Sequence, residues 1–101
     1  MRKLLFALAL AALPLPAFAA DVTVTIRNFD YSPMDITIPA GTTVEWKNLD
    51  GEPHTVASID GAFRSPALDQ GDSYRFTFAS PGTFKYICSI HPKMKATITV
   101  R

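Results

Sequence analysis

The segment Cys88–Met94 concentrates side chains that can bind a metal ion. It reads Cys-Ser-Ile-His-Pro-Lys-Met and contains the only cysteine of the sequence, one of its two histidines and one of its three methionines. Thiolate and thioether sulfur are soft ligands that suit copper, and imidazole suits copper as well. The residue types and their spacing therefore indicate a copper site, which the rest of the chain must position.

His54 is the second histidine, and it lies far from this segment in the sequence. Two histidines and one cysteine in a trigonal arrangement, with a weak axial methionine, are typical of blue-copper electron-transfer sites. Zinc also accepts cysteine and histidine, but its usual fourth ligand is Cys, His, Asp or Glu rather than a thioether. The donor set therefore favours copper over zinc, with the candidate ligands His54, Cys88, His91 and Met94.

Each candidate ligand also has an ordinary explanation when it is taken alone. A buried cysteine behaves as a small hydrophobe, and methionine commonly fills gaps in a core. Two further alternatives are a thiol enzyme with a Cys88–His91 pair and a metal-free interaction module. The sequences that surround known cysteine nucleophiles are absent, and an interaction module leaves the clustering of Cys88, His91 and Met94 unexplained. The metal site is therefore the favoured interpretation.

The first nineteen residues have the composition of a secretory signal peptide. Arg2 and Lys3 precede an apolar run from Leu4 to Leu13, and Ala17-Phe18-Ala19 provides a small-x-small cleavage site. The apolar run is shorter than the roughly 20 residues that span a membrane. We therefore expect residues 1–19 to be removed on export to the periplasm, leaving one domain over residues 20–101 with no membrane span.

The charge of the mature chain limits its partners. The full sequence has ten basic and nine acidic residues, so removing Arg2 and Lys3 leaves eight basic against nine acidic ones. A nucleic-acid-binding domain would show a basic surplus or stripe, so no nucleic-acid partner is expected. An exported chain with a single cysteine cannot form an internal disulfide, and a metal ligand is one explanation for that thiol.

Short segments of alternating apolar and polar residues follow the signal peptide, as in half-buried strands. They predict strands over residues 22–27, 35–38, 42–47, 54–56, 74–78, 84–88 and 95–101. Residues 28–33 and 48–53 are expected to be turns or loops, and residues 60–72 a long connection that could include a helical turn at 66–68. Short strands separated by regular turns predict an all-β sandwich or barrel.

The expected strand register places the candidate ligands at one end of this fold. Phe84, Tyr86 and Cys88 share one face of their strand, so the cysteine should point inward. His91 and Met94 follow in the loop where that strand ends. Asn48 and Thr55 flank the His54 region and are candidates for the hydrogen bonds that hold metal ligands in place.

Four segments resemble those of the cupredoxins, the type 1 blue copper proteins, and the resemblance extends over essentially the whole mature chain. They are Val44–Asn48, Pro53–Val56, Gly82–Cys88 and Cys88-x-x-His91-Pro92-x-Met94. The short ligand loop, with two residues in each gap between Cys, His and Met, resembles that of amicyanin. Two positions depart from the pattern, since amicyanin has an aromatic residue at Lys93 and the family often has Asn at Thr55.

The resemblance implies a Greek-key β-sandwich of about seven to eight strands with one copper ion at one end. It implies that His54, Cys88 and His91 are the strong ligands, that Met94 is the weak axial ligand, and that electrons pass through the solvent-facing His91. The implied protein is a soluble, monomeric one-electron carrier rather than an enzyme. Its implied partners are redox proteins, for example a dehydrogenase donor and a cytochrome acceptor. The alternative is a periplasmic copper carrier or buffer that delivers the ion to an acceptor protein.

Overall fold

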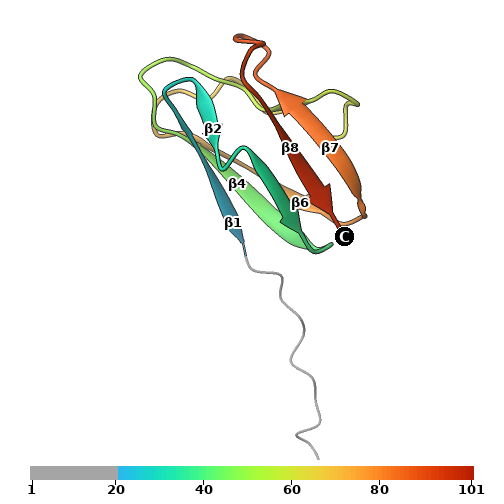
Figure 1. The fold of residues 1–101 in the computed structure, drawn as a ribbon. Coiled ribbons are helices and arrows are strands. Elements are labelled where there is room, and N and C mark those ends of the chain that lie inside the picture. Colours follow the sequence, from blue (N-terminus) through green and yellow to red (C-terminus); the bar gives the residue numbers. More distant parts are fainter. Residues whose placement is uncertain (1–20) are drawn as a thin grey trace, which may run out of the picture.

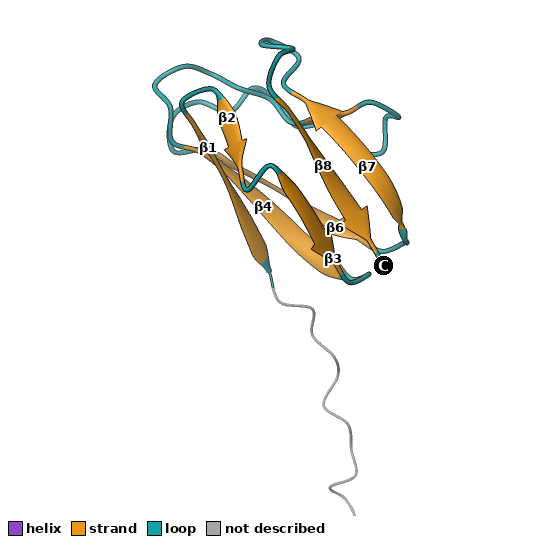
Figure 2. Ribbon diagram, in the orientation of Figure 1, coloured by secondary structure: helices purple, strands orange, loops and turns teal. Residues whose placement is uncertain are grey.

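The computed structural model describes residues 21–101, so the predicted signal peptide lies outside the described residues. The described part consists of strands and their connections (Figures 1 and 2), and none of its segments is a helix long and apolar enough to cross a membrane. Its strands are β1 (Val22–Arg27), β2 (Asp30–Ser32), β3 (Asp35–Ile38), β4 (Thr42–Asn48), β5 (Ala57–Ser58), β6 (Ser73–Phe78), β7 (Gly82–Ile87) and β8 (Lys95–Val100).

The strands form two four-stranded sheets that pack face to face. The first sheet has the order β2-β1-β4-β6 and the second has the order β3-β8-β7-β5. β1 runs parallel to β4, and β3 runs parallel to β8, while the remaining neighbours are antiparallel. The chain therefore crosses repeatedly between the sheets, and the prediction of an all-β Greek-key sandwich with seven to eight strands is confirmed.

The core between the sheets follows from the period-two pattern of the strands. Val44 and Trp46 of β4 are fully buried, and so is Ile98 of β8. The Trp46 ring stacks on Phe63 with centroids 5.6 Å apart and meets the edge of Tyr86 at 5.5 Å. Burying these large apolar side chains supplies the main driving force for folding, and it fixes the sheets that carry the ligand loops.

The structure differs from the expected strands near His54. The short strand predicted at residues 54–56 is wrong, because β5 comprises Ala57–Ser58 and His54 pairs instead with Leu68 in an isolated bridge. The His54 N–H donates to the Leu68 carbonyl at 3.0 Å, and the Leu68 N–H donates to the His54 carbonyl at 2.7 Å. The helical turn considered at residues 66–68 is also absent, because both backbone groups of Leu68 are used in this extended pairing.

Two other segments near the site refine the expected boundaries. Residues 28–33 were expected to be irregular but contain β2, which pairs with β1 through a tight turn. The connection over residues 60–72 contributes the buried side chains of Phe63 and Leu68 to the core. This connection therefore covers part of the core.

One end of the sandwich gathers the loops that carry the candidate ligands. The turn between β1 and β2, the loop after β4 and the loop between β7 and β8 all lie at the end opposite the C-terminal residue (Figure 1). Tyr31 of β2 connects these regions, because its buried hydroxyl donates to the Thr55 carbonyl at 2.7 Å. Its ring also packs edge-on against Tyr86 of β7 at 4.7 Å.

The Tyr31→Phe substitution is expected to lower the free energy of unfolding of the metal-free protein by about 1–2 kcal/mol, because it leaves the buried Thr55 carbonyl without this donor. Urea unfolding followed by tryptophan fluorescence measures the change. The matched control is Tyr74→Phe, a half-buried tyrosine for which no hydroxyl hydrogen bond is found within residues 21–101. Equal losses in the two variants would contradict a specific contribution from the Tyr31 hydrogen bond.

Candidate metal centre

Cys88 begins the loop between β7 and β8, one residue after β7 ends. Its side chain is fully buried, on the same face as Tyr86, which confirms the predicted inward orientation. The Cys88 N–H donates to the Met94 carbonyl at 3.1 Å, and the Met94 N–H donates to the His91 carbonyl at 2.9 Å. These two bonds close the loop on itself, so that three side chains from one short segment converge.

The nitrogen and sulfur atoms of the two histidines and the cysteine form a compact triangle. Cys88 Sγ lies 3.9 Å from His54 Nδ1 and 3.8 Å from His91 Nδ1, and one ligand atom from each of the three residues lies within 4.8 Å of the other two. A trigonal ion with bonds of about 2.3 Å to sulfur and about 2.0 Å to nitrogen would separate those atoms by about 3.7 Å. The triangle therefore has the size that a single ion requires.

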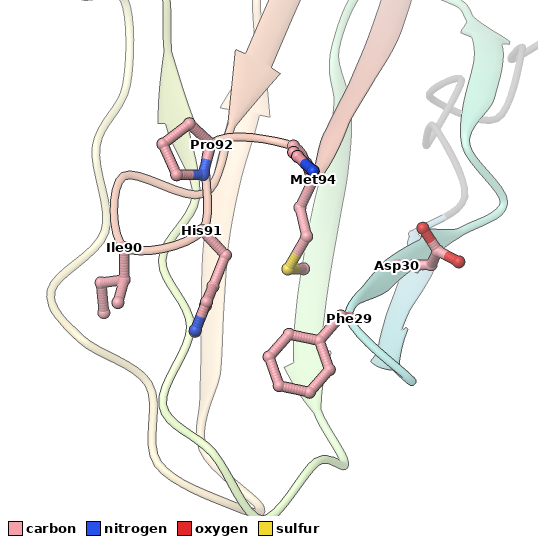
Figure 3. A pocket seen from close by; sticks show the side chains of 7 residues that line it. Phe29, Asp30, Ile90, His91, Pro92 and Met94 are labelled. Carbon is pink, nitrogen blue, oxygen red and sulfur yellow. The ribbon is translucent and has the colours of Figure 1, made fainter.

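Met94 lies at the same end of the sandwich, in the same loop as Cys88 and His91. Its side chain is buried, with 3% of its surface exposed. Figure 3 shows the thioether of Met94 and the ring of His91 extending into the same space from opposite sides of the loop. The structure thus brings together all four residues that the sequence singled out, and the presence of a thioether rather than a carboxylate favours copper over zinc.

Thr55 connects the His54 segment to the cysteine. Its backbone N–H donates to Cys88 Sγ at 3.3 Å, and its hydroxyl lies 3.8 Å from the same sulfur. The hydroxyl also accepts from the Ser89 N–H at 2.7 Å and lies 2.8 Å from the Ser89 hydroxyl. The His54 segment and the Cys88 loop are therefore held together by hydrogen bonds within the polypeptide.

The surroundings of Cys88 favour its thiolate form. Burial alone would raise the pKa of the thiol, but the Thr55 N–H, the two histidine rings and the Ile90 N–H outweigh that effect and lower the pKa of Cys88 to about 6. The thiolate, not the thiol, is the form that binds metals. The polypeptide is therefore prepared to present an anionic sulfur ligand near neutral pH.

Asn48 braces the loop that precedes His54. Its buried amide donates to the carbonyls of Glu52 and Leu68 at 2.9 and 2.8 Å, and its side-chain oxygen accepts from the Asp50 N–H at 2.9 Å. The sequence-based interpretation of Asn48 and Thr55 as hydrogen-bonding neighbours of the site is therefore correct. Both residues fix the backbone on either side of His54 rather than contacting its ring.

Asp50 contacts the His54 ring, and the sequence analysis missed it. One carboxylate oxygen lies 2.8 Å from His54 Nε2 and also accepts from the Phe29 N–H at 2.9 Å, while the other accepts from the Asn28 N–H at 2.7 Å. Partial burial opposes ionisation, but these donors outweigh it and hold the pKa of Asp50 below its ordinary value. Asp50 therefore fixes the orientation of the His54 ring, with Nδ1 on the side that faces Cys88.

Phe29 is the second residue that the sequence analysis missed. Its ring meets the rings of His54 and His91 edge-on, with centroids 5.0 and 4.9 Å away. Phe29 also lines a depression in the surface together with Asp30 and the loop residues Ile90–Met94 (Figure 3). Nothing in its spacing relative to the ligands could have indicated this contact, because the β1–β2 turn reaches the site only through the tertiary fold.

A family model, related sequences and solved structures all assign this chain to the same family. The model of the cupredoxin-like domain matches residues 3–100. Amicyanin-alpha of Methylorubrum extorquens is 31% identical, and the alignment covers 99% of each chain. A plastocyanin of Scenedesmus fuscus is 34% identical over 70% of this chain and 86% of its own. A purple cupredoxin from Nitrosopumilus maritimus superposes with a TM-score of 0.76 at 36% identity, covering 79% of this chain and 99% of that one.

These similarities agree with the geometry of the site. They confirm the predicted resemblance to cupredoxins, and to amicyanin in particular. Together with the Cys88, His54 and His91 triangle, they confirm one copper ion as the cofactor. The protein belongs to the cupredoxin family, with the architecture of a copper-binding β-sandwich that carries its metal site at one end.

Proposed function

We propose that this chain is a soluble, periplasmic type 1 copper protein that carries single electrons between redox partners. In this proposal His54, Cys88 and His91 are the strong ligands and Met94 is the weak axial ligand. The observation that carries the proposal is the triangle of one sulfur and two imidazole nitrogens within 4.8 Å, beside a buried thioether. This is the donor set of blue-copper electron-transfer sites.

The protein's own contribution to electron transfer is to keep the donor atoms in place. Copper, when bound, supplies a one-electron couple between Cu(I) and Cu(II). Asp50 orients the His54 ring, and the Thr55 N–H fixes the Cys88 sulfur. Both contacts form within the polypeptide, so the ligands need to rearrange little when the charge changes. Such supporting contacts also tune the properties of a metal site.

His91 is the candidate route for electrons. It is the one partly exposed member of the triangle, whereas His54 and Cys88 are fully buried. The surrounding surface includes Phe29 and Ile90, two of the exposed large hydrophobic residues. Lys93 and Lys95, which flank Met94, are also exposed. Their charges would form a basic rim that steers an acidic partner, and the alternative is that both are ordinary solvated lysines.

The remaining parts of the proposal concern the cell and the partners. Residues 1–19 act as a cleaved export signal, residues 20–101 form the mature domain, and the mature protein acts as a monomer. Relatives named amicyanin and plastocyanin support an electron carrier rather than an enzyme. We expect redox proteins as partners, such as a dehydrogenase donor and a cytochrome acceptor.

Adding Cu(II) to the purified metal-free protein is expected to produce an intense thiolate-to-copper absorption in the visible spectrum. Cys88→Ala should abolish this absorption, because it removes the sulfur donor. Met94→Ala should retain it while shifting the reduction potential, because Met94 is the weak ligand. A wild-type protein that stays colourless and binds zinc more tightly than copper would contradict the proposal.

The electron-carrier role predicts that copper is retained through repeated oxidation and reduction. Cycling the loaded protein with ferricyanide and ascorbate, and measuring bound copper after gel filtration, tests this. The rival role of copper delivery predicts rapid loss of the ion to a competing Cu(I) chelator such as bathocuproine disulfonate. Prompt and complete transfer to that chelator under reducing conditions would support delivery over electron transfer.

The metal-free protein is expected to hold Cys88 as a thiolate above about pH 6, since the pKa of Cys88 is lowered to about 6. In the unfolded chain the thiol has its ordinary pKa of about 8.5. The lowered pKa of Cys88 therefore adds to the free energy of unfolding, fully above about pH 8.5, and this contribution is lost as the pH falls through about 6. Ultraviolet thiolate absorption, taken as the difference from Cys88→Ser, follows the titration. A midpoint near 8.5 in the folded protein would refute the expectation.

A further inference from the structure

The turn between β1 and β2 has a strained backbone at Phe29. Arg27 and Asp30 pair across the hairpin, so Asn28 and Phe29 are its two central residues. Their φ angles are +54° and +60°, which places both in the left-handed region. A two-residue turn of this kind favours Asn followed by Gly. Asn28 fits the first position, but Phe29 occupies the position where glycine would be free of strain.

A bulky residue at positive φ is uncommon and strains the backbone. Burial offsets little of that strain, because 44% of the Phe29 surface remains exposed. The turn itself needs only a backbone that tolerates positive φ. The strain at Phe29 therefore calls for an explanation beyond the hairpin.

The contacts of the Phe29 ring supply that explanation. The ring meets His54 edge-on at 5.0 Å and an interplanar angle of 87°, and meets His91 at 4.9 Å and 85°. The ring thus contacts both imidazoles while 44% of the Phe29 surface stays exposed to solvent, and it faces the Met94 thioether across the depression (Figure 3). No other aromatic ring in residues 21–101 contacts both histidines in this way.

Asp50 holds the strained turn against the site. Its carboxylate accepts hydrogen bonds from the N–H groups of both left-handed residues, Asn28 and Phe29, and it also contacts His54 Nε2. Charge-assisted hydrogen bonds of this kind are stronger than those between neutral groups. One side chain therefore fixes the shape of the turn and the orientation of a ligand ring at the same time.

We propose that Phe29 is a shield over the metal site, held in its strained turn by Asp50, that keeps water and small anions away from an ion bound between His54 and His91. This role rests on the proposed copper site and adds an access-controlling residue outside the ligand set. The strained backbone is then the cost of placing an aromatic ring where glycine would leave an opening.

The test compares Phe29→Gly with Asn28→Gly. Both substitutions place glycine at a left-handed position of the same turn, but only the first removes the ring. Each Cu(II)-loaded protein is titrated with azide and followed by visible absorption and electron paramagnetic resonance. Phe29→Gly is expected to lower the azide dissociation constant by about tenfold or more, whereas Asn28→Gly should behave as the wild type does.

Urea unfolding of the metal-free variants provides an independent readout. Phe29→Gly should leave the free energy of unfolding unchanged or raised, since glycine relieves the strain. A clear loss of stability would show that Phe29 serves mainly in packing and would overturn the strain argument. Phe29→Asn, which also tolerates positive φ, serves as a second ring-removing variant if Phe29→Gly does not fold.

Unchanged azide affinity in a copper-loaded, ring-removing variant would overturn the shield. Failure of the wild-type protein to form the thiolate–copper absorption is a different result, because it would count against the proposed copper site itself. The two failures are therefore distinguishable in the same set of spectra.

Discussion

The hydrogen bond from the Thr55 N–H to the Cys88 sulfur is the contact on which the site depends. It joins two segments that are 33 residues apart, at a distance of 3.3 Å. It lowers the pKa of the thiol and fixes the position of the sulfur relative to His54, the neighbour of Thr55. β4 of the first sheet leads into one of these segments, and β7 of the second sheet leads into the other. The packing of the two sheets therefore brings the Thr55 N–H and the Cys88 sulfur together.

Asp50 makes a second set of contacts that reinforce the site. Its carboxylate connects the β1–β2 turn to the His54 ring, so three connections of the fold meet around one small volume. These hydrogen bonds all form within the polypeptide. Contacts that fix the orientation of ligand side chains limit the movement that accompanies a change of charge at a metal site.

Local sequence patterns predicted much of the fold because strands bury alternate residues. The register of Phe84, Tyr86 and Cys88 followed from that alternation, and the structure confirms it. The patterns failed around His54, where the expected strand at residues 54–56 is replaced by a bridge to Leu68. The backbone of residues 54–56 pairs with the connection over residues 60–72 rather than with a strand of a sheet, and periodicity carries no information about such partners.

The sequence by itself determined the chemistry of this protein, since the types and spacing of His54, Cys88, His91 and Met94 limit the metal and its ligand loop. Only the tertiary structure decided what surrounds those donors. Asp50 lies four residues before His54, yet its link to the β1–β2 turn depends on how β1 pairs with β4. Phe29 reaches both imidazoles for the same reason. Contacts between segments distant in sequence arise from sheet topology, which residue types and local spacing do not encode.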